Sequence, residues 1–506
     1  MAAADPQVRI ALLERELHWA QLTIQKREAE IRQLLERLRK QRIGFLGPSS
    51  ETLSDLQLEL LIEHEPSTTR QEVEAESRRE PIAEPRERKA HPGRKPLPEN
   101  LPRIEEVIGC AANCARCGGM TAVIGYDLSE VLDREPAKWF VRVTKREKRS
   151  CGKCLSVQMP ELAPRIVDKG LASDRVVIET VVSKYCDHVP LYRQEAMLER
   201  EAGVELSRAT LDGWVMRVGE LLEPVVAAMR ADVLRASYIQ ADETIVPVQM
   251  HDGRGADHQA YLWQYGSLLN GRGGETVFDF QLGRGRDGPA KFLKDWNGIL
   301  QTDGYQAYDR VGGSDLIHVG CWAHARRKFV DAVKVNPKDG AAIAMVTRMD
   351  ALFLVDRHAR EQKLGTEDRA ALRREHAQPW VEEIHSECLK LRSQLLPKSA
   401  LGEAANYTLN MWTKLRRCFD HAEVELSNNI AENSMRPIAL GRKNWLHVGS
   451  AKSGPKVAAI LSVVESCRRI GVPVKEYLLA VLPGMNQRKI AEVTSLTPAR
   501  WKSARP

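Results

Sequence analysis

Three acidic residues are spaced along the chain as candidate ligands of one metal centre. Asp242 lies in ADETIVPV, Asp303 lies 61 positions later in QTDGYQAYDRV, and Glu432 lies a further 129 positions on in NNIAENSMRPIALGRKNW. Clustered carboxylates repel one another, and their hard oxygen atoms favour Mg²⁺. Two such ions about 3.5 to 4 Å apart can activate the attacking oxygen and stabilise the leaving oxygen at a phosphodiester. The acids therefore predict phosphoryl transfer with two Mg²⁺, for which Mn²⁺ is a substitute, provided that the fold brings them together.

Glu432 also has a simpler interpretation, an ion pair with Arg436 one turn later on a surface helix. Asn428 or Asn429 is predicted to cap this helix and to place Glu432 in its first turn. Basic residues near the acids are candidate DNA-phosphate contacts: Arg326, Arg327, Lys328, Arg436, Arg442 and Lys443. Cys321 and His324, in CWAHARRKF, resemble half of a metal site. Without a second pair, we interpret Cys321 as a core residue.

The elements that must position the acids begin near residue 236, where the hydropathy period becomes two. The segments ASYIQADETIVPVQ, HQAYLWQYGS and ETVFDFQL predict three strands, GPAKFLKDW predicts a helix, and NGILQTDGYQAY predicts a fourth strand. This order is typical of a ribonuclease-H-like α/β core, in which the strands of Asp242 and Asp303 are parallel neighbours.

The core is predicted in two parts, residues 234–328 and residues 423–482, the second of which carries Glu432, followed by a tail over 483–506. The stretch 329–422 between them is too long for an ordinary connection, so it predicts a helical insertion. Trp380 and Trp412 in this insertion could stack on exposed bases, although core packing is the favoured interpretation.

Two CxxC pairs, Cys114 with Cys117 and Cys151 with Cys154, predict one structural Zn²⁺ in a module over residues 104–160. Cys110 is a candidate substitute ligand. The basic stretch beside the second pair is either a DNA-backbone contact or a solvated strand; it contains Arg142, Lys145, Arg146, Lys148 and Arg149.

The N-terminal third predicts three further parts. Apolar residues recur at steps of three and four from Ile10 to Leu38, which predicts a dimerising coiled coil over residues 8–42 or a helix docked on its own domain. Residues 66–103 are rich in Pro, Glu and Arg and predict a flexible linker. Residues 170–230 predict consecutive helices, with a turn at Gly203 and a cap at Ser207. They form either a helix-turn-helix DNA reader or an ordinary helical domain.

Composition narrows the class of protein only moderately. The 506 residues contain 75 Lys and Arg against 68 Asp and Glu, a net charge of +7 that does not by itself indicate a nucleic-acid partner. No run of eighteen apolar residues is present, so a soluble, cytoplasmic protein without a membrane partner is expected. No GxxxxGK[ST] loop occurs and GRGRDG near Gly283 predicts only a turn, so no nucleotide is expected.

The strings ADETIVPV, QTDGYQAYDRV, CWAHARRKF and NNIAENSMRPIALGRKNWLHVGS, in this order, closely resemble transposases of the bacterial insertion sequence 66 family. The resemblance extends over most of the chain. It implies a DDE-type transposase with Asp242, Asp303 and Glu432 as the metal-binding triad. Ser427 stands where the family usually has an aspartate, and His447 follows Leu446 where the family commonly has a phenylalanine. Neither change touches an implied metal ligand.

The resemblance implies a multidomain α+β protein that cuts and joins DNA at element ends and target. Its expected partners are DNA, a second copy or more of the chain, and small accessory proteins encoded by the same element; when DNA-bound it would lie with the nucleoid. Two other classes stay open. One is a zinc-containing DNA-binding regulator or an inactive transposase descendant, and the other is a ribonuclease-H-like nuclease or junction resolvase.

Overall fold

The computed structural model describes residues 139–145, 149–150, 157–158, 161–168, 170–250, 257–269 and 272–505. The predicted coiled coil, the linker and all four candidate zinc ligands lie outside these residues. Two short strands, β1 (Arg149–Ser150) and β2 (Val157–Gln158), pair antiparallel. The elements described below all belong to one compact unit of the chain.

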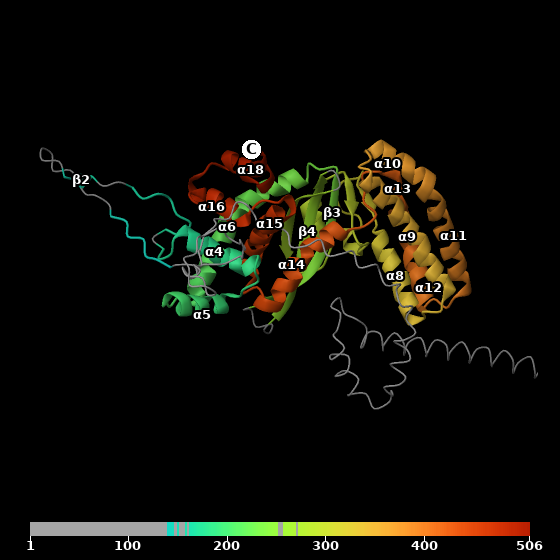
Figure 1. Cartoon of the computed structure of the whole chain (residues 1–506), viewed down its shortest axis with the longest axis horizontal. Helices are drawn as coiled ribbons and strands as arrows, with labels where there is room; N and C mark the ends of the chain where they lie inside the picture. Colours follow the sequence, from blue (N-terminus) through green and yellow to red (C-terminus); the bar gives the residue numbers. More distant parts are fainter. Residues whose placement is uncertain are drawn as a thin grey trace, which may run out of the picture. The chain divides into compact units, whose positions relative to one another are not determined.

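A five-stranded mixed sheet is the centre of this unit (Figure 1). Its strands lie in the order β5-β4-β3-β6-β7. Antiparallel pairing joins β3 (Tyr238–Gln249), β4 (Asp257–Leu269) and β5 (Arg272–Gln281), whereas β6 (Ile299–Gln301) and β7 (Ile317–Val319) continue the sheet in parallel with β3. The predicted meander, helix and fourth strand are thus present, with α7 (Asp287–Leu293) as the helix.

The fourth strand is much shorter than predicted. It ends at Gln301, because Gly304 adopts a left-handed backbone with φ of 97° and turns the chain into the 3₁₀ helix η1 (Gln306–Tyr308). Asp303 therefore lies just beyond the carboxyl end of β6, in the turn.

A helical layer packs against β3, β4 and β5. It begins with α4 (Asp174–Tyr185), α5 (Leu191–Ala202) and α6 (Arg208–Val233). The predicted turn is present: Gly203 ends α5 in the left-handed region, and the Ser207 side chain accepts a hydrogen bond from the Thr210 amide at the start of α6. One face of α6 is buried in the main core, whereas its first residues, Arg208 to Thr210, are exposed.

Helix α15 (Gly454–Ile470) covers the outer edge of the sheet. The amides of Thr276 and Phe278 in β5 donate to the hydroxyls of Ser466 and Ser462 at 2.9 and 2.8 Å. The Ser466 hydroxyl returns a hydrogen bond to the Thr276 carbonyl at 2.9 Å. These side chains satisfy main-chain groups that an edge strand would otherwise leave unpaired.

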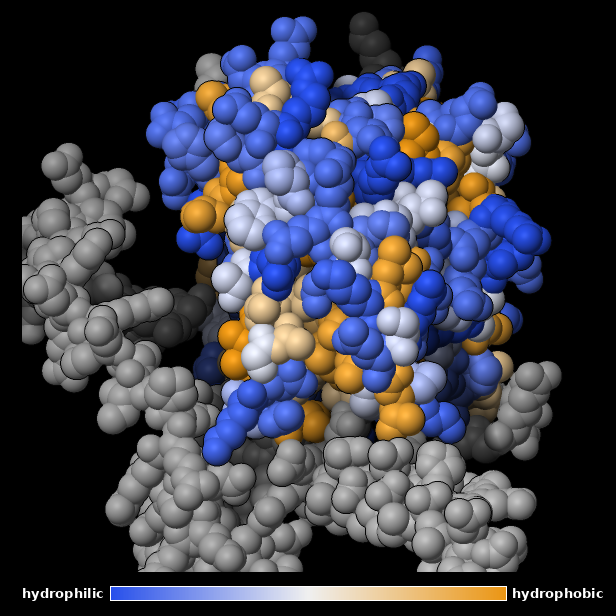
Figure 2. All heavy atoms as spheres, turned by 90° about the vertical axis from the view of Figure 1, so that its right-hand side faces the viewer, coloured by the Kyte–Doolittle hydropathy of each residue, from blue (hydrophilic) through white to orange (hydrophobic). Residues whose placement is uncertain are grey.

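The segment between the two parts of the core is a helical unit with its own core. Its helices are α8 (Trp322–Val335), α9 (Gly340–Glu361), α10 (Thr366–Leu372), the π-helical turn η2 (Arg373–Ala377), α11 (Gln378–Gln394), α12 (Ala400–Asn410) and α13 (Trp412–Asp420). Tyr238, Ile299 and Val319 of the sheet join this second core. The outer face of the unit is mostly hydrophilic, with small groups of apolar residues (Figure 2).

After the insertion the chain returns to the sheet through α14 (Asn429–Trp445), which packs on β3 and β4. The remaining short elements complete the main core: η3 (Ala451–Ser453), α16 (Val474–Val481), η4 (Met485–Gln487), α17 (Ile490–Val493), η5 (Thr494–Leu496) and α18 (Pro498–Ser503). Among the described residues no helix is both long and apolar enough to cross a membrane.

Candidate functional site

Asp242 and Asp303 lie at equivalent positions along two neighbouring, parallel segments of the chain. Gln240 in β3 pairs in register with Gln301 in β6, and each aspartate comes two residues after its glutamine. Asp303 itself lies just past the end of β6, so the parallel register brings it to the same end of the sheet as Asp242. The negative charge of Asp303 contributes to the raised pKa of Asp242, so the two carboxylates lie close enough to interact.

Helix α14 is fastened beside Asp242 by its first turn. The Asn428 side chain is fully buried and donates to the Ala241 carbonyl at 2.9 Å. Asn428 occupies the predicted N-cap position, but its side chain makes no capping hydrogen bond, since it is committed to β3 instead. Glu432 lies one turn later, and its amide donates to the Asn428 carbonyl at 3.1 Å. The first turn of α14 therefore holds Glu432 close to Asp242.

A pair of buried glutamines supports this arrangement. Gln240 Nε2 donates to Gln301 Oε1 at 2.8 Å and to the Ser427 carbonyl at 2.9 Å. Gln301 Nε2 donates to the carbonyls of Gly320 and Glu425, at 3.1 and 2.7 Å. The sequence analysis missed both residues, although QAD and QTD repeat the same spacing on two strands. Ser427, which differs from the family pattern, accepts the hydrogen bond of Gln240 with its main-chain carbonyl. This contact therefore does not depend on the Ser427 side chain.

The charges at the site explain why a cation fits it. Burial raises the pKa of Asp242 to about 8, and the negative charges of Glu243, Asp303 and Glu432 act in the same direction. All three candidate ligands therefore interact electrostatically. A divalent cation would relieve this repulsion, and the oxygen-only donor set fits Mg²⁺.

A fourth acid, Glu243, has its own partners and is distinct from the triad. Arg284 donates to its carboxylate at 3.1 and 2.7 Å, and the Tyr308 hydroxyl donates at 3.0 Å. Arg284 lies in the turn between β5 and α7 that the sequence predicted around Gly283. The Arg284 guanidinium also lies over the Tyr305 ring, 4.0 Å from its centroid. We therefore assign Glu243 a structural role beside the acids.

Glu432 has its charged partners on α8, whereas the simpler interpretation proposed Arg436 on its own helix. His324 Nδ1 lies 3.7 Å from Glu432 Oε1, and Arg327 Nη2 lies 3.6 Å from Glu432 Oε2. Among the described residues, no ion pair joins Glu432 to Arg436. Cys321, His324 and Glu432 together place one sulfur, one nitrogen and one oxygen within 4.8 Å of one another. Cys321 is buried, as predicted, and its side chain also lies near His324 and Glu432.

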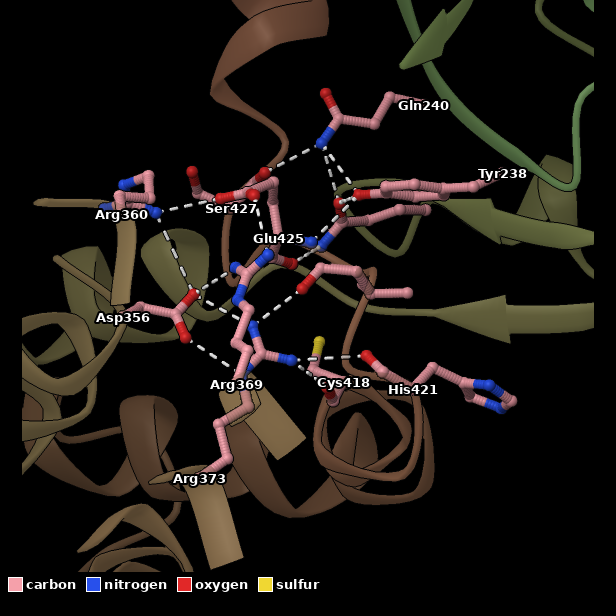
Figure 3. A network of polar contacts seen from close by, with 12 residues as sticks. Tyr238, Gln240, Asp356, Arg360, Arg369, Arg373, Cys418, His421, Glu425 and Ser427 are labelled. Carbon is pink, nitrogen blue, oxygen red and sulfur yellow. Dashed lines mark hydrogen bonds and ion pairs between the residues drawn. The ribbon is translucent and has the colours of Figure 1, made fainter. Parts of the chain in front are cut away.

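An ionic network ties the insertion to the segment that precedes α14 (Figure 3). Arg373 is buried and forms two hydrogen bonds with Asp356, at 2.8 and 2.9 Å. Arg369 bridges Asp356 and Glu425, at 2.7 and 3.1 Å, and Arg360 also binds Glu425. Arg373 further donates to the carbonyls of Cys418, His421 and Val424. These contacts fix the chain just before Asn428, and so they help to place Glu432.

The six candidate phosphate contacts have different surroundings. Arg326 pairs with Asp350, at 2.5 and 3.1 Å, and Arg442 donates to the Thr244 hydroxyl and the Ile245 carbonyl of β3. The others are exposed: Arg327, Lys328, Arg436 and Lys443. Arg327 and Lys328 are on α8, and Arg436 and Lys443 are on α14, the two helices that border the acids.

The two tryptophans of the insertion differ. Trp412 packs on the second core and stacks on His385 with ring centroids 4.3 Å apart, which agrees with the core interpretation. Trp380 is 38% exposed on α11.

Comparison with known proteins identifies the class of protein. A family model described as Transposase IS66 family matches residues 169–456, more than half of the chain and the whole of the site. The chain belongs to the IS66 family of transposases. Two further models match the N-terminal part: one described as the zinc-finger binding domain of transposase IS66, over residues 112–154, and one described as Transposase C of IS166 homeodomain, over residues 33–105.

The zinc-finger match includes Cys114, Cys117, Cys151 and Cys154 and supports a structural zinc ion, whereas Cys110 lies outside it. The chain is also similar to uncharacterized proteins of Sinorhizobium fredii. It is 34% identical to y4qI over 81% of this chain and 77% of the relative, and 32% identical to y4jD over 80% of this chain and 82% of the relative.

Proposed function

We propose that this transposase cleaves DNA at the ends of its element and transfers the freed strands to target DNA, with Asp242, Asp303 and Glu432 as its metal-binding catalytic residues on a ribonuclease-H-like core. The observation that carries the proposal is the register of β3 and β6, with Asn428 fastening the helix of Glu432 to the same strand end. The strand order β5-β4-β3-β6-β7 supports the core assignment.

The reaction consists of two substitutions at phosphorus. In the first, a water oxygen bonds to phosphorus and the 3′ oxygen leaves with a proton as a free hydroxyl. In the second, this hydroxyl attacks a target phosphodiester, whose own 3′ oxygen leaves. Two Mg²⁺ held by the three acids would supply activation of the attacking oxygen and charge neutralisation at the leaving oxygen.

The protein's own residues position the DNA and the acids. Asp242 and Asp303 present their carboxylates from one strand end, and Glu432 closes the site from α14. Exposed Arg327 and Lys328 on α8, with Arg436 and Lys443 on α14, would bind backbone phosphates on either side of the acids. Binding of phosphates by these side chains sets the position of the DNA and does not read its sequence.

The exposed start of α6 is the part of the described chain that supports sequence reading. Arg208 and Thr210 project from its first turn, beyond the region where α6 enters the core. A helix-turn-helix commonly reads bases with the N-terminal residues of its second helix. We therefore assign element-end recognition to this turn, with dimerisation left to the predicted N-terminal coiled coil.

The test is an assay with the purified full chain, DNA that carries an element end, target DNA and Mg²⁺. Wild-type protein should give cleaved and strand-transfer products. Asp303→Asn should bind DNA with unchanged affinity and give neither product, because a neutral amide cannot replace a carboxylate ligand. Asp315→Asn, an exposed aspartate between β6 and β7, is the matched control and should retain both steps.

The outcomes also separate the alternatives. Cleavage without joining indicates a nuclease or resolvase, and binding without cleavage indicates a regulator or an inactive descendant. Strand transfer by Asp303→Asn would refute the assignment of the triad.

A further inference from the structure

We propose that Cys321, His324 and Glu432 form a second metal site, for a thiolate-binding divalent ion of the Zn²⁺ class, next to the acids. Mg²⁺ is not suited to it, because Mg²⁺ takes oxygen ligands in octahedral geometry, whereas a sulfur, nitrogen and oxygen set suits Zn²⁺ or Co²⁺. The site does not depend on the proposed transposition chemistry, since it follows from ligand atoms alone.

The distances are close to those that a shared ion requires. Zn–S bonds of about 2.3 Å and Zn–N or Zn–O bonds of about 2.0 to 2.2 Å place tetrahedral ligand atoms about 3.3 to 3.8 Å apart. His324 Nδ1 and Glu432 Oε1 are already 3.7 Å apart, and all three ligand atoms lie within 4.8 Å. A small side-chain movement of Cys321 completes the set. The fourth tetrahedral position is left to water or another ligand.

Two buried polar atoms at this place have no hydrogen-bond partner. His324 Nδ1 and Glu432 Oε1 are both buried and unsatisfied, and they face one another beyond hydrogen-bonding distance. An unsatisfied buried polar atom costs about 1 to 3 kcal/mol. A metal ion between them would satisfy both atoms at once, which ordinary core packing does not explain.

Both ligand-bearing elements are fixed by main-chain contacts. Cys321 immediately precedes α8 and His324 lies in its first turn, so the two side chains have the close spacing of a CxxH pair. The Trp322 amide donates to the Leu426 carbonyl at 2.9 Å. Burial raises the pKa of the Cys321 thiol to about 11, and the Asn428 amide, which donates to Cys321 Sγ at 3.3 Å, partly opposes this rise. Metal binding would displace the thiol proton. The start of α8 and the start of α14 are therefore held together around the three ligands.

Glu432 belongs to both centres, and this has a direct consequence. If Glu432 Oε1 binds the thiolate-held ion, Oε2 is the oxygen left for the Mg²⁺ set formed with Asp242 and Asp303. Glu432 would then bridge the two sites, which differ in their other ligands.

The test is a Co²⁺ titration of the full chain, prepared with its cysteine-rich module loaded with Zn²⁺. A closed tetrahedral site of four thiolates suits Zn²⁺ and holds it more firmly than a site with one thiolate, so the module stays loaded. We expect one further Co²⁺ to bind per chain, with a sulfur-to-cobalt charge-transfer band in the near ultraviolet. Cys321→Ser should lose this band. Cys388→Ser is the matched control, a fully buried cysteine in the core of the insertion, and should keep it.

A second variant keeps the test decisive if Cys321→Ser does not fold. His324 is partly exposed, so His324→Gln should fold and should bind Co²⁺ more weakly by at least about tenfold, the smallest loss expected even for a residue outside the first ligand sphere. Absence of the band in wild-type protein, or unchanged Co²⁺ affinity in His324→Gln, would overturn the proposal. Neither readout uses DNA, so failure here is distinct from failure of the strand-transfer assay.

Discussion

Asp242 is the acid whose ionisation depends most clearly on its neighbours. Its pKa of about 8 in the folded, ion-free protein lies far above the ordinary aspartate value of 3.8, because the carboxyl is buried beside other acids. A carboxyl with a raised pKa contributes its stability fully below the unfolded pKa and loses it as the pH rises through the folded pKa. The ion-free protein should therefore lose stability between about pH 4 and pH 8.

This linkage predicts how Mg²⁺ stabilises the protein. Binding must displace the Asp242 proton below pH 8, so the increase in Tm caused by Mg²⁺ should be larger at pH 8.5 than at pH 6. Asp242→Asn should remove this pH dependence, and without Mg²⁺ it should melt above wild type at pH 8.5. Thermal unfolding at both pH values measures these effects. An equal Mg²⁺ effect at the two pH values in wild type contradicts the prediction.

Gln301 is a neutral residue whose hydrogen bonds help to position the nearby acids. Gln301→Leu keeps the size of the side chain but leaves the Gly320 and Glu425 carbonyls without their donor, at a cost of about 1 to 3 kcal/mol for a buried group. We expect that loss in urea unfolding, together with at least about a tenfold loss of strand transfer, since small displacements of catalytic groups reduce rates strongly. Gln281→Leu, at the end of β5, is the control. Wild-type strand transfer by Gln301→Leu would remove its positioning role.

At the scale of elements, the contact between α15 and β5 depends on two serines. Ser466→Ala should remove both the acceptor for the Thr276 amide and the donor to its carbonyl, in a fully buried environment. The expected cost is about 1 to 3 kcal/mol in the free energy of unfolding. Ser393→Ala, an exposed serine near the end of α11, should change it by less than about 0.5 kcal/mol. Equal effects of the two changes would show that the edge contact is unimportant.

The sequence predicted the elements better than their contacts. Alternating hydropathy predicted β3, β4 and β5, and the glycine and serine at 203 and 207 predicted the turn before α6, because these patterns are local. The fourth strand was predicted, but its early end at Gln301 was not, since the left-handed turn at Gly304 depends on tertiary packing. The parallel pairing of β3 with β6 followed from element order.

The candidate site was predicted in part. Asp242, Asp303 and Glu432 were chosen from motifs and family resemblance, and the structure brings them within electrostatic reach of one another. The position of His324 beside Glu432 could not be predicted, because two helices that are distant in sequence meet there. The further ligand that we propose beside Cys321 and His324 is the carboxylate of Glu432 on another helix. No local spacing in the sequence reveals this neighbour.

At the scale of the whole described unit, buried ion pairs connect the helical insertion to the segment that precedes α14. Arg373→Met should leave Asp356 with fewer partners in a fully buried place and free three main-chain carbonyls. Breaking a buried pair in this way costs about 3 to 5 kcal/mol. Arg348→Met removes a more exposed pair with Glu383 and should cost less than about 1 kcal/mol. Urea unfolding compares the two, and a similar small loss for both would contradict a central role for the network.

Helices lie against both edge strands of the sheet in the part of the chain that the structure describes. Serine hydroxyls of α15 bind main-chain groups of Thr276 and Phe278 in β5, and α13 lies against the short β7. Covered edges leave another polypeptide little strand to extend by main-chain pairing. The copies that we propose to gather on two DNA ends would therefore recognise one another through side chains on helices or through the predicted N-terminal coiled coil, which leaves the acid-bearing strands undisturbed while the complex assembles.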